Sequence, residues 1–210
     1  MRLVALDLSL TATGVVSANG PSVIKGYDQG MRRLHSIRQR IFQAVADADV
    51  VVIEGYSFGS GMRAHTLGEL GGVVRLMLFD NEIPFAVVPP ANLKQYACGK
   101  GNASKDDVFA AAIRRLDYPG RSKDEADALW LYAMAADHYG LLAKPVVPAS
   151  HRAALQKVTW PVVGLEGSGS DGGKEAPDGS DDRGGVNNSE FDGVHPSGPS
   201  SLPDTTVAVP

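Results

Sequence analysis

Apolar residues in the first 27 positions come in short stretches separated by turn-forming residues. Residues 2–8, 13–17 and 22–27 have the apolar and β-branched character of strands. The sequence Asn19-Gly20-Pro21 supplies a turn between the second and the third stretch. Three short strands joined this tightly predict an antiparallel meander.

Helical spacing then alternates with short apolar runs. Apolar side chains recur at helical spacing over residues 31–45, which predicts an amphipathic helix. Residues 49–53 (Asp-Val-Val-Val-Ile) form a nearly continuous apolar run, which is typical of a strand buried on both faces of a parallel sheet. We expect a second helix over 64–80 and a last strand over 84–88.

Two further helices have recognisable starts. Ser104, with Asp107 three residues later, resembles a capping box ahead of a helix over 108–116. Ser122 and Glu125 form an S-x-x-E capping box ahead of a helix over 126–138. The resulting element order is that of the ribonuclease-H-like layered α/β fold, a mixed five-stranded sheet flanked by helices, and we predict this fold for residues 1–160.

The composition changes after residue 160. Residues 164–210 contain 10 Gly, 7 Ser and 5 Pro, and such a segment buries too little surface to offset its ordering entropy. We therefore predict that residues 161–210 form a disordered Gly/Ser/Pro-rich acidic tail. The tail holds nine acidic and two basic residues, so the whole-chain net charge of −4 conceals a net charge of +3 in the rest. A mildly basic domain is compatible with a polyanionic partner, and the tail either solvates the chain or competes for that partner's site.

Cysteine usage and hydropathy exclude two classes of protein. The single cysteine, Cys98, excludes an intramolecular disulfide framework. No stretch approaches the roughly 18 consecutive apolar residues of a membrane helix, and the start lacks the pattern of a secretory signal. We therefore expect a cytoplasmic protein without a membrane partner.

Carboxylates stand where two predicted strands end. Asp7 closes the first strand and Glu54 follows the apolar run, although a buried charge is costly unless it is paired or bound to a metal. Asp124 and Asp127 are three residues apart near the start of the last helix, so both lie on one helix face. Taken singly, Asp7 is also compatible with a strand-end turn, and Asp124 with a favourable place at a helix N-terminus.

The four acids together predict a metal site. Carboxylates brought together repel one another and raise each other's pKa values, and a divalent cation removes that conflict. Oxygen ligands suit Mg²⁺ or Mn²⁺ rather than zinc, and we expect two ions that activate a water and stabilise the leaving oxygen in phosphodiester cleavage. The five histidines show no metal-ligand spacing, and we assign none of them.

This pattern resembles the RuvC-type Holliday junction resolvases, which are crossover junction endodeoxyribonucleases of the ribonuclease-H-like superfamily. The family has an Asp on the first strand, a Glu ending the fourth strand and an Asp-x-x-Asp-Ala pair on the last helix. Asp7, Glu54, Asp124 and Asp127 match these positions in order. The resemblance implies that these four residues are the catalytic metal ligands, and that no nucleotide cofactor is used. It also implies a homodimer that cuts four-way (Holliday) DNA junctions symmetrically in recombination, repair or clearance of branched DNA.

The resemblance extends to the residues expected to contact DNA. The segment from residue 90 to residue 105 is similar to the family's, and this implies that Lys94 and Lys105 lie near the scissile phosphate. An aromatic side chain after the Glu wedges into the junction in the family, and here Tyr56 or Phe58 takes that place or else belongs to the core or the dimer interface. The full set of expected DNA contacts is Tyr56, Phe58, Lys94, Lys100, Lys105, Arg114, Arg121 and Lys123.

Some features depart from the pattern or leave alternatives open. The family's Asp-Pro-Gly after the first strand is Asp7-Leu8-Ser9 here. The glycines of the 64–80 helix suit either a dimer interface or packing within one chain. A nuclease of the same fold for flaps, forks or RNA remains an alternative, as does a non-catalytic scaffold for branched DNA. An actin-like ATPase would need a second phosphate loop, which we do not find. A compact resolvase would suit a bacteriophage, acting then in the host cytoplasm.

Overall fold

The computed structural model describes residues 1–55 and 62–164, without the side chains of residues 62–67. Chain contacts separate Met1–Gly167 from Ser168–Pro210, and every described residue belongs to the first of these units. The two aromatic residues expected to wedge into DNA, Tyr56 and Phe58, lie outside the described residues. The same is true of nearly all of the tail predicted for 161–210.

Five strands form one mixed sheet with the order β3-β2-β1-β4-β5. β1 pairs antiparallel with β2, and β2 pairs antiparallel with β3, so the meander is confirmed. β1 and β4, and then β4 and β5, run parallel. The strands are β1 (Leu3–Asp7), β2 (Ala12–Ser17), β3 (Gly20–Lys25), β4 (Val50–Glu54) and β5 (Phe85–Val88).

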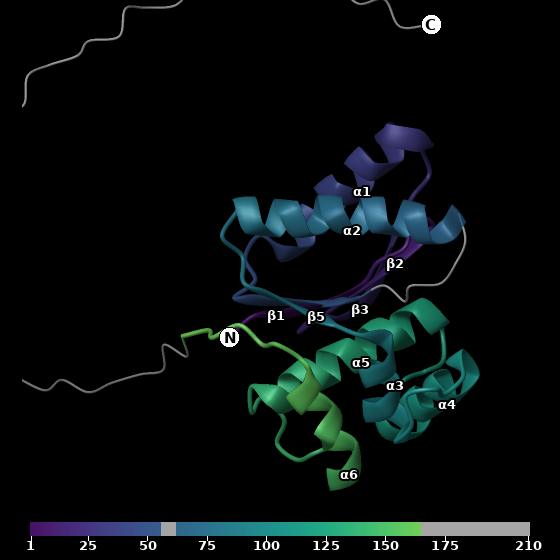
Figure 1. Ribbon diagram of the computed structural model, residues 1–210, viewed down its shortest axis with the longest axis vertical. Coiled ribbons are helices and arrows are strands. Elements are labelled where there is room, and N and C mark those ends of the chain that lie inside the picture. Colours follow the sequence, from purple (N-terminus) through teal and green to yellow (C-terminus); the bar gives the residue numbers. More distant parts are fainter. Residues whose placement is uncertain (56–61, 165–210) are drawn as a thin grey trace, which may run out of the picture. The chain divides into compact units, whose positions relative to one another are not determined.

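Helices cover both faces of the sheet, as Figure 1 shows. One face carries α1 (Gly30–Val45) and α2 (Met62–Asp80). The other face carries α3 (Pro90–Cys98), α4 (Lys105–Arg115), α5 (Lys123–His138), α6 (Ala149–Arg152) and the 3-10 helix η1 (Ala153–Lys157). Among the described residues, we find no helix with the length and apolar character needed to cross a bilayer. The ribonuclease-H-like layered fold predicted from the sequence is confirmed.

Alternation along the strands divides the core into two layers. Leu3 and Ala5 of β1 belong to the layer with α3, α4 and α5, whereas Val4 and Leu6 belong to the layer with α1 and α2. β4 follows the same rule, because successive side chains of a strand point to opposite faces. Asp7 continues the series of Leu3 and Ala5, and Glu54 continues the corresponding series of β4. Both carboxylates therefore point to the face that carries α5.

Three elements, in two segments, were missing from the sequence prediction. The segment that begins at Pro90 was interpreted as a connection, but residues 90–98 form helix α3, with proline at its first position and Gly99 at its end. Proline is favourable there because the first amide of a helix has no partner within the helix. Gly99 ends α3 with a φ of 81°, the left-handed conformation that glycine adopts readily. Residues 149–157, for which no element was predicted, form α6 and η1.

One of the two predicted capping boxes is confirmed and the other is only half formed. Ser104 and Asp107 make the complete reciprocal pair at the start of α4. At α5 the Ser122 hydroxyl accepts from the amide of Glu125, but the Glu125 carboxylate does not return the bond. It accepts instead from the Tyr118 hydroxyl at 2.7 Å, and the Ser122 amide donates to that same hydroxyl oxygen. A tertiary contact has thus replaced half of a local motif.

The buried carboxylate of Asp137 in α5 binds side chains of α3 and α6. Asp137 of α5 accepts two hydrogen bonds of 2.8 Å from the Arg152 guanidinium. It also accepts one of 3.0 Å from the Tyr96 hydroxyl of α3. The Asp137 side chain is only 4% exposed, so both partners are needed to compensate its buried charge. This network holds together the two helices that carry several of the candidate site residues.

Candidate metal and active site

Three carboxylates meet at one edge of the sheet. Asp7 ends β1, Glu54 ends the neighbouring parallel strand β4, and Asp127 lies in the second turn of α5. Each offers an oxygen such that all three oxygens lie within 4.8 Å of one another. Asp7 and Asp127 are each 9% exposed, so the oxygens converge in a largely enclosed position. The structure thus brings together three of the four acids expected from the sequence.

A glycine lets α5 come this close to the sheet. Gly14 of β2 lies opposite Asp7 of β1. A β-carbon added to Gly14 would lie 2.3 Å from the carbonyl oxygen of Asp124 and 3.1 Å from the β-carbon of Ala128. Only a residue without a side chain fits there, and sequence reasoning missed this role. A glycine inside a strand was the available signal, since it often marks close approach of another backbone.

Burial raises the pKa values of all three converging acids. Burial, followed by the negative charge of Asp127, raises the pKa of Glu54 to about 7. The pKa of Asp7 lies well above its ordinary value because of burial and then the charges of Glu54 and Asp127. Burial also raises the pKa of Asp127, with Lys105 opposing. Three oxygen donors held together at this electrostatic cost fit a divalent cation, which would take the place of the protons.

The fourth acid is engaged by a lysine. The Nζ atom of Lys105 lies 3.3 Å from Asp124 and 3.2 Å from Asp127, so it bridges the two acids of α5. Burial lowers the pKa of Lys105, but the charges of Asp127, Asp7 and Asp124 outweigh it and the pKa is raised. Lys105 therefore stays charged beside the carboxylates. Asp124, whose side chain is 37% exposed, lies at the rim of the site rather than among the three converging acids.

Lys94 of α3 also contributes to the site. Its positive charge is among the causes that hold down the pKa values of Glu54 and Asp127. Its side chain is only half-buried. The two lysines expected near the scissile phosphate thus both act on the acid cluster, and the helix that carries Lys94 is the one that sequence reasoning had missed.

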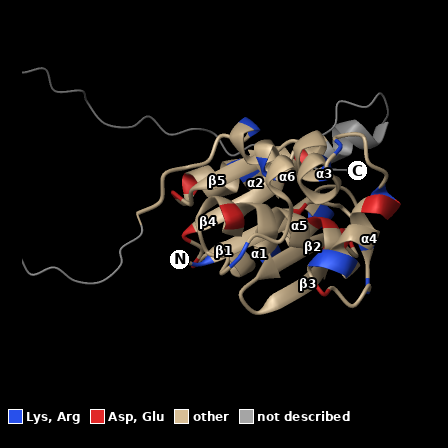
Figure 2. Ribbon diagram, turned by 90° about the horizontal axis from the view of Figure 1, so that it is seen from below, with Lys and Arg blue, Asp and Glu red and all other residues tan. Residues whose placement is uncertain are grey.

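The remaining basic residues expected to contact DNA lie on the surface of α4, α5 and the adjoining turns. Lys100 pairs with Asp107 at 3.7 Å, and Lys123 pairs with Asp106. Arg121 pairs with Glu125 at 3.1 Å, while Arg114 is exposed on α4. Figure 2 shows red and blue segments close together beside the labels of α5 and α4. Three of these four cations thus have an acidic neighbour with which a phosphate would have to compete.

Comparison with known proteins finds relatives that are similar over most of their own length. The chain matches no protein-family model. It is 32% identical over 145 residues to the crossover junction endodeoxyribonuclease RuvC of Parasynechococcus marenigrum, covering 61% of this chain and 94% of the relative. It is 28% identical over 146 residues to the RuvC of Prochlorococcus marinus, again with 61% and 94% coverage.

Solved structures agree on the fold. The Thermus thermophilus RuvC structure superimposes with a TM-score of 0.53 at 22% identity, covering 67% of this chain and 97% of that one. The structure of T. thermophilus RuvC in complex with a Holliday junction substrate gives a TM-score of 0.51 at 21% identity. Identity of about a third over nearly the whole length of a relative, together with the same layered fold, shows that this chain belongs to the RuvC family of crossover junction endodeoxyribonucleases.

Proposed function

We propose that this protein is a divalent-metal-dependent endonuclease that resolves four-way DNA junctions by hydrolysing phosphodiester bonds. The observation that carries the proposal is the convergence of Asp7, Glu54 and Asp127 within 4.8 Å, in a chain of the RuvC family. The relatives are named for crossover junction cleavage, and this activity needs a site of oxygen ligands for hard cations.

The proposed cation is Mg²⁺ or Mn²⁺, with two ions in the working site. Asp7, Glu54 and Asp127 would hold one ion, and Asp124 would complete the site for a second once Lys105 donates to a phosphate instead of to Asp124. Ions bound there would supply Lewis-acid chemistry that lowers the pKa of the attacking water and stabilises the leaving 3′ oxygen. A cation binds the ionised form of a carboxyl group, so the raised pKa values of Asp7 and Glu54 make cation binding release protons.

The lysine and arginine side chains have a separate role in this proposal. Lys105 and Lys94 present positive charge beside the carboxylates, where a scissile phosphate would otherwise be repelled. The ammonium group of Lys105 has three donors, so it can exchange a carboxylate for a phosphate oxygen without leaving the site. Lys100, Arg114, Arg121 and Lys123 are proposed as contacts to phosphates farther from the cut, and Tyr56 or Phe58 as the residue that unstacks a base.

We propose a homodimer formed through the exposed face of α2. Leu76 and Phe79 are 60% and 74% exposed. Gly68 and Gly72 lie on the same helix face, and a β-carbon added to either would meet nothing within 4 Å. Two copies of this face would place two sites symmetrically on a symmetric junction. Replacing Phe79 with Asp should shift the protein from dimer to monomer in light scattering coupled to gel filtration, and an unchanged mass would refute this interface.

The division of the chain is also a proposal. Residues 1–160 would carry the nuclease, and residues 161–210 a disordered acidic tail. A nuclease of cellular or phage DNA would act in the cytoplasm where that DNA lies.

The decisive experiment measures cleavage of a labelled synthetic four-way junction beside a matched linear duplex and a flap. Mg²⁺ should support symmetric nicks confined to the junction, and EDTA should abolish them. Asp7→Asn should abolish cleavage but leave junction binding largely intact, because phosphate contacts dominate affinity. Loss of binding together with cleavage would contradict a purely metal-ligating role for Asp7.

Two other outcomes would favour the alternatives. Preferential cutting of flaps, forks or RNA would retain the active site but change the substrate. Junction binding without cleavage in any divalent cation would mean that the protein is a scaffold.

A further inference from the structure

Positive charge collects along the free edge of the sheet, where β3 meets α1. The sheet order ends with β3, so this strand has a partner on one side only. Helix α1 follows after a short turn, and it carries four arginines and no acidic residue. Asp28 is the one acid between Lys25 and the start of the helix. On α4 and the start of α5, in contrast, acids and cations stand side by side.

Two of the α1 arginines are held by backbone carbonyl groups and not by carboxylates. The Arg40 guanidinium donates to the carbonyl oxygen of Lys25 at 2.8 Å, and the Nε atom of Arg33 donates to that of Asp28. Among the residues that the structure describes, no ion pair involves Lys25 or an arginine of α1. A neutral carbonyl group orients a guanidinium without cancelling its charge, and further N–H donors remain. A phosphate that arrives here has no carboxylate to displace, unlike at the paired cations of α4 and α5.

Strand register relates this edge to the acid cluster. Asp7 lies opposite Gly14 of β2, and Gly14 lies opposite Val23 of β3. Neighbouring strands are about 4.8 Å apart, so the row that contains Asp7 reaches β3 after roughly 10 Å. Residues of one row point to one face, so Val23, and Lys25 two positions later, point to the α5 face as Asp7 does. Ile24 between them belongs to the core layer with α1 and α2, as this alternation requires.

Lys25 and three arginines therefore form a continuous basic surface around the edge, which we call the β3–α1 strip (Lys25, Arg32, Arg33 and Arg40). Lys25 begins the strip on the face of the acids, and the arginines continue it on α1. Arg33 and Arg40 are seven residues apart on one helix face, a separation of about 10 Å or roughly three base-pair steps. Their bonds to the chain at β3 place them on the flank of α1 toward β3, so the strip does not use the exposed face of α2.

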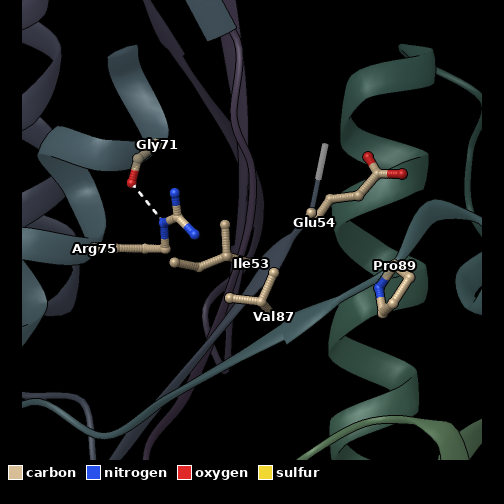
Figure 3. Close-up of a pocket in the computed structure, with 7 residues that line it drawn as sticks. Ile53, Glu54, Gly71, Arg75, Val87 and Pro89 are labelled. Carbon is tan, nitrogen blue, oxygen red and sulfur yellow. Dashed lines mark hydrogen bonds between the residues drawn. The ribbon is translucent and has the colours of Figure 1, made fainter. Parts of the chain in front are cut away.

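The surface on the β5 side of the acids has a different character. A cavity of about 370 Å³ there is lined largely by aliphatic side chains such as Ile53 and Val87. Arg75 also lines it, but its Nε atom donates to the carbonyl oxygen of Gly71 at 3.1 Å (Figure 3). A phosphate in this cavity would leave most of its oxygens against aliphatic surface, which is unfavourable. The backbone of a DNA arm is therefore better accommodated at the β3 edge.

We propose that the β3–α1 strip binds the phosphate backbone of the duplex arm that leads away from the cleaved strand. The inference rests on the proposed function and deepens it, because it assigns a place to the DNA beyond the cut. Guanidinium groups suit this partner, since they bind phosphate with two parallel N–H donors. Contacts to phosphates carry no sequence information, so the strip adds affinity and orientation without selecting the bond that is cut.

The first test measures junction affinity against salt concentration, with the full-length protein in EDTA so that no cleavage occurs. Arg33→Ala/Arg40→Ala should make the slope of log affinity against log salt shallower by about 2, because each lost phosphate contact releases about one counterion fewer. Its affinity at about 0.1 M salt should fall roughly tenfold. The matched control, Arg2→Ala/Lys144→Ala, removes the same charge from two exposed positions. Arg2 precedes β1, at the end opposite Asp7, and Lys144 follows α5, so this control should keep the wild-type slope.

The second test neutralises the DNA instead of the protein. Methylphosphonate linkages remove the charge of chosen phosphates, and blocks of three can be moved along one arm. The distances above place the effective block roughly three to six nucleotides from the cut. That block should weaken binding of the wild type roughly tenfold, and of Arg33→Ala/Arg40→Ala about twofold or less, because both changes remove the same contacts.

A further variant keeps the proposal testable if the double arginine variant fails to fold. The Lys25 side chain is exposed, and it is the backbone carbonyl of this residue that is bonded to α1. Lys25→Glu should therefore fold as the wild type and weaken junction binding, whereas the control Lys144→Glu should not. With Mg²⁺ and saturating protein, Lys25→Glu should cut at the wild-type rate, since the strip acts in binding and not in the chemical step.

The outcomes separate this inference from the proposed function. A folded Arg33→Ala/Arg40→Ala protein with the wild-type salt slope would overturn the strip as a DNA surface, even if the strip then bound an acidic protein. Equal effects of the methylphosphonate block on wild type and variant would also overturn it. In both cases junction cleavage itself would stand. A wild type that neither binds nor cuts junctions would overturn both proposals together.

Discussion

The strongest quantitative prediction concerns the stability of the metal-free protein as the pH rises. The perturbation is a change from pH 5 to pH 8.5 in EDTA. The pKa of Glu54 is about 7 in the folded protein, against an ordinary value of 4.5. Below pH 4.5 the carboxyl is protonated in the folded and the unfolded chain, so the stability contributed by the neutral group is fully present. Between 4.5 and 7 only the unfolded chain releases the proton, so stability falls with rising pH, and above pH 7 the loss is complete.

The magnitude follows from the separation of the two pKa values. Each pKa unit corresponds to about 1.4 kcal/mol, so ionising Glu54 in the folded protein should cost about 3 kcal/mol of unfolding free energy. The raised pKa of Asp7 adds to the loss in the same direction. Mg²⁺ at pH 8.5 should restore stability, because the cation replaces the protons as the partner of the carboxylates.

Urea denaturation at pH 5, 7 and 8.5 measures this effect, with Glu54→Gln as the control. The glutamine variant has no carboxyl at this position, so it should lose less stability than the wild type over the range and gain less from Mg²⁺. Equal pH-dependent losses in the two proteins would refute the raised pKa of Glu54 as their cause. A wild type that became more stable with rising pH would refute the sign of the argument.

Three further predictions concern the scaffold of the site. Gly14→Ala would place a β-carbon 2.3 Å from the carbonyl oxygen of Asp124. We therefore expect the free energy of unfolding to fall by roughly 1–3 kcal/mol in thermal denaturation, and Mg²⁺ binding to weaken in calorimetry. Wild-type values in both assays would mean that α5 does not need this close approach. Tyr96→Phe removes one buried hydrogen bond to Asp137 and should cost about 1 kcal/mol with unchanged Mg²⁺ affinity; a weakened metal site would mean that the network also positions the acids. Ser104→Ala removes the cap of α4 and should cost about 1 kcal/mol, whereas Ser104→Asp should retain most of it; equal losses in the two variants would exclude capping as the cause.

Local patterns were sufficient for most of the architecture. The meander follows from short apolar stretches separated by turn residues, and the buried parallel strand follows from a continuous apolar run. The amphipathic helix follows from the 3.6-residue spacing of its apolar side chains, which depends on chain geometry alone. α3 was missed because its nine residues are too few for a clear period, and its start was interpreted as a connecting segment. α6 and η1 were missed because they are shorter still and are held by tertiary contacts such as the ion pair between Arg152 and Asp137.

The sequence by itself determined which residues could do the chemistry, because four carboxylates at the ends of apolar strands and on one face of a helix start together indicate a metal site, although each alone has other uses. The strict alternation of strand side chains places Asp7 on the same side of β1 as Leu3 and Ala5, but only the structure showed that this side carries α5. Only the tertiary structure decided that Asp127 converges with them while Asp124 pairs with Lys105, since both acids occupy one helix face and their roles depend on how α5 crosses the sheet. The same holds for the need for glycine at position 14. Such features arise where elements distant in the sequence come into contact, and no local pattern records the distance between them.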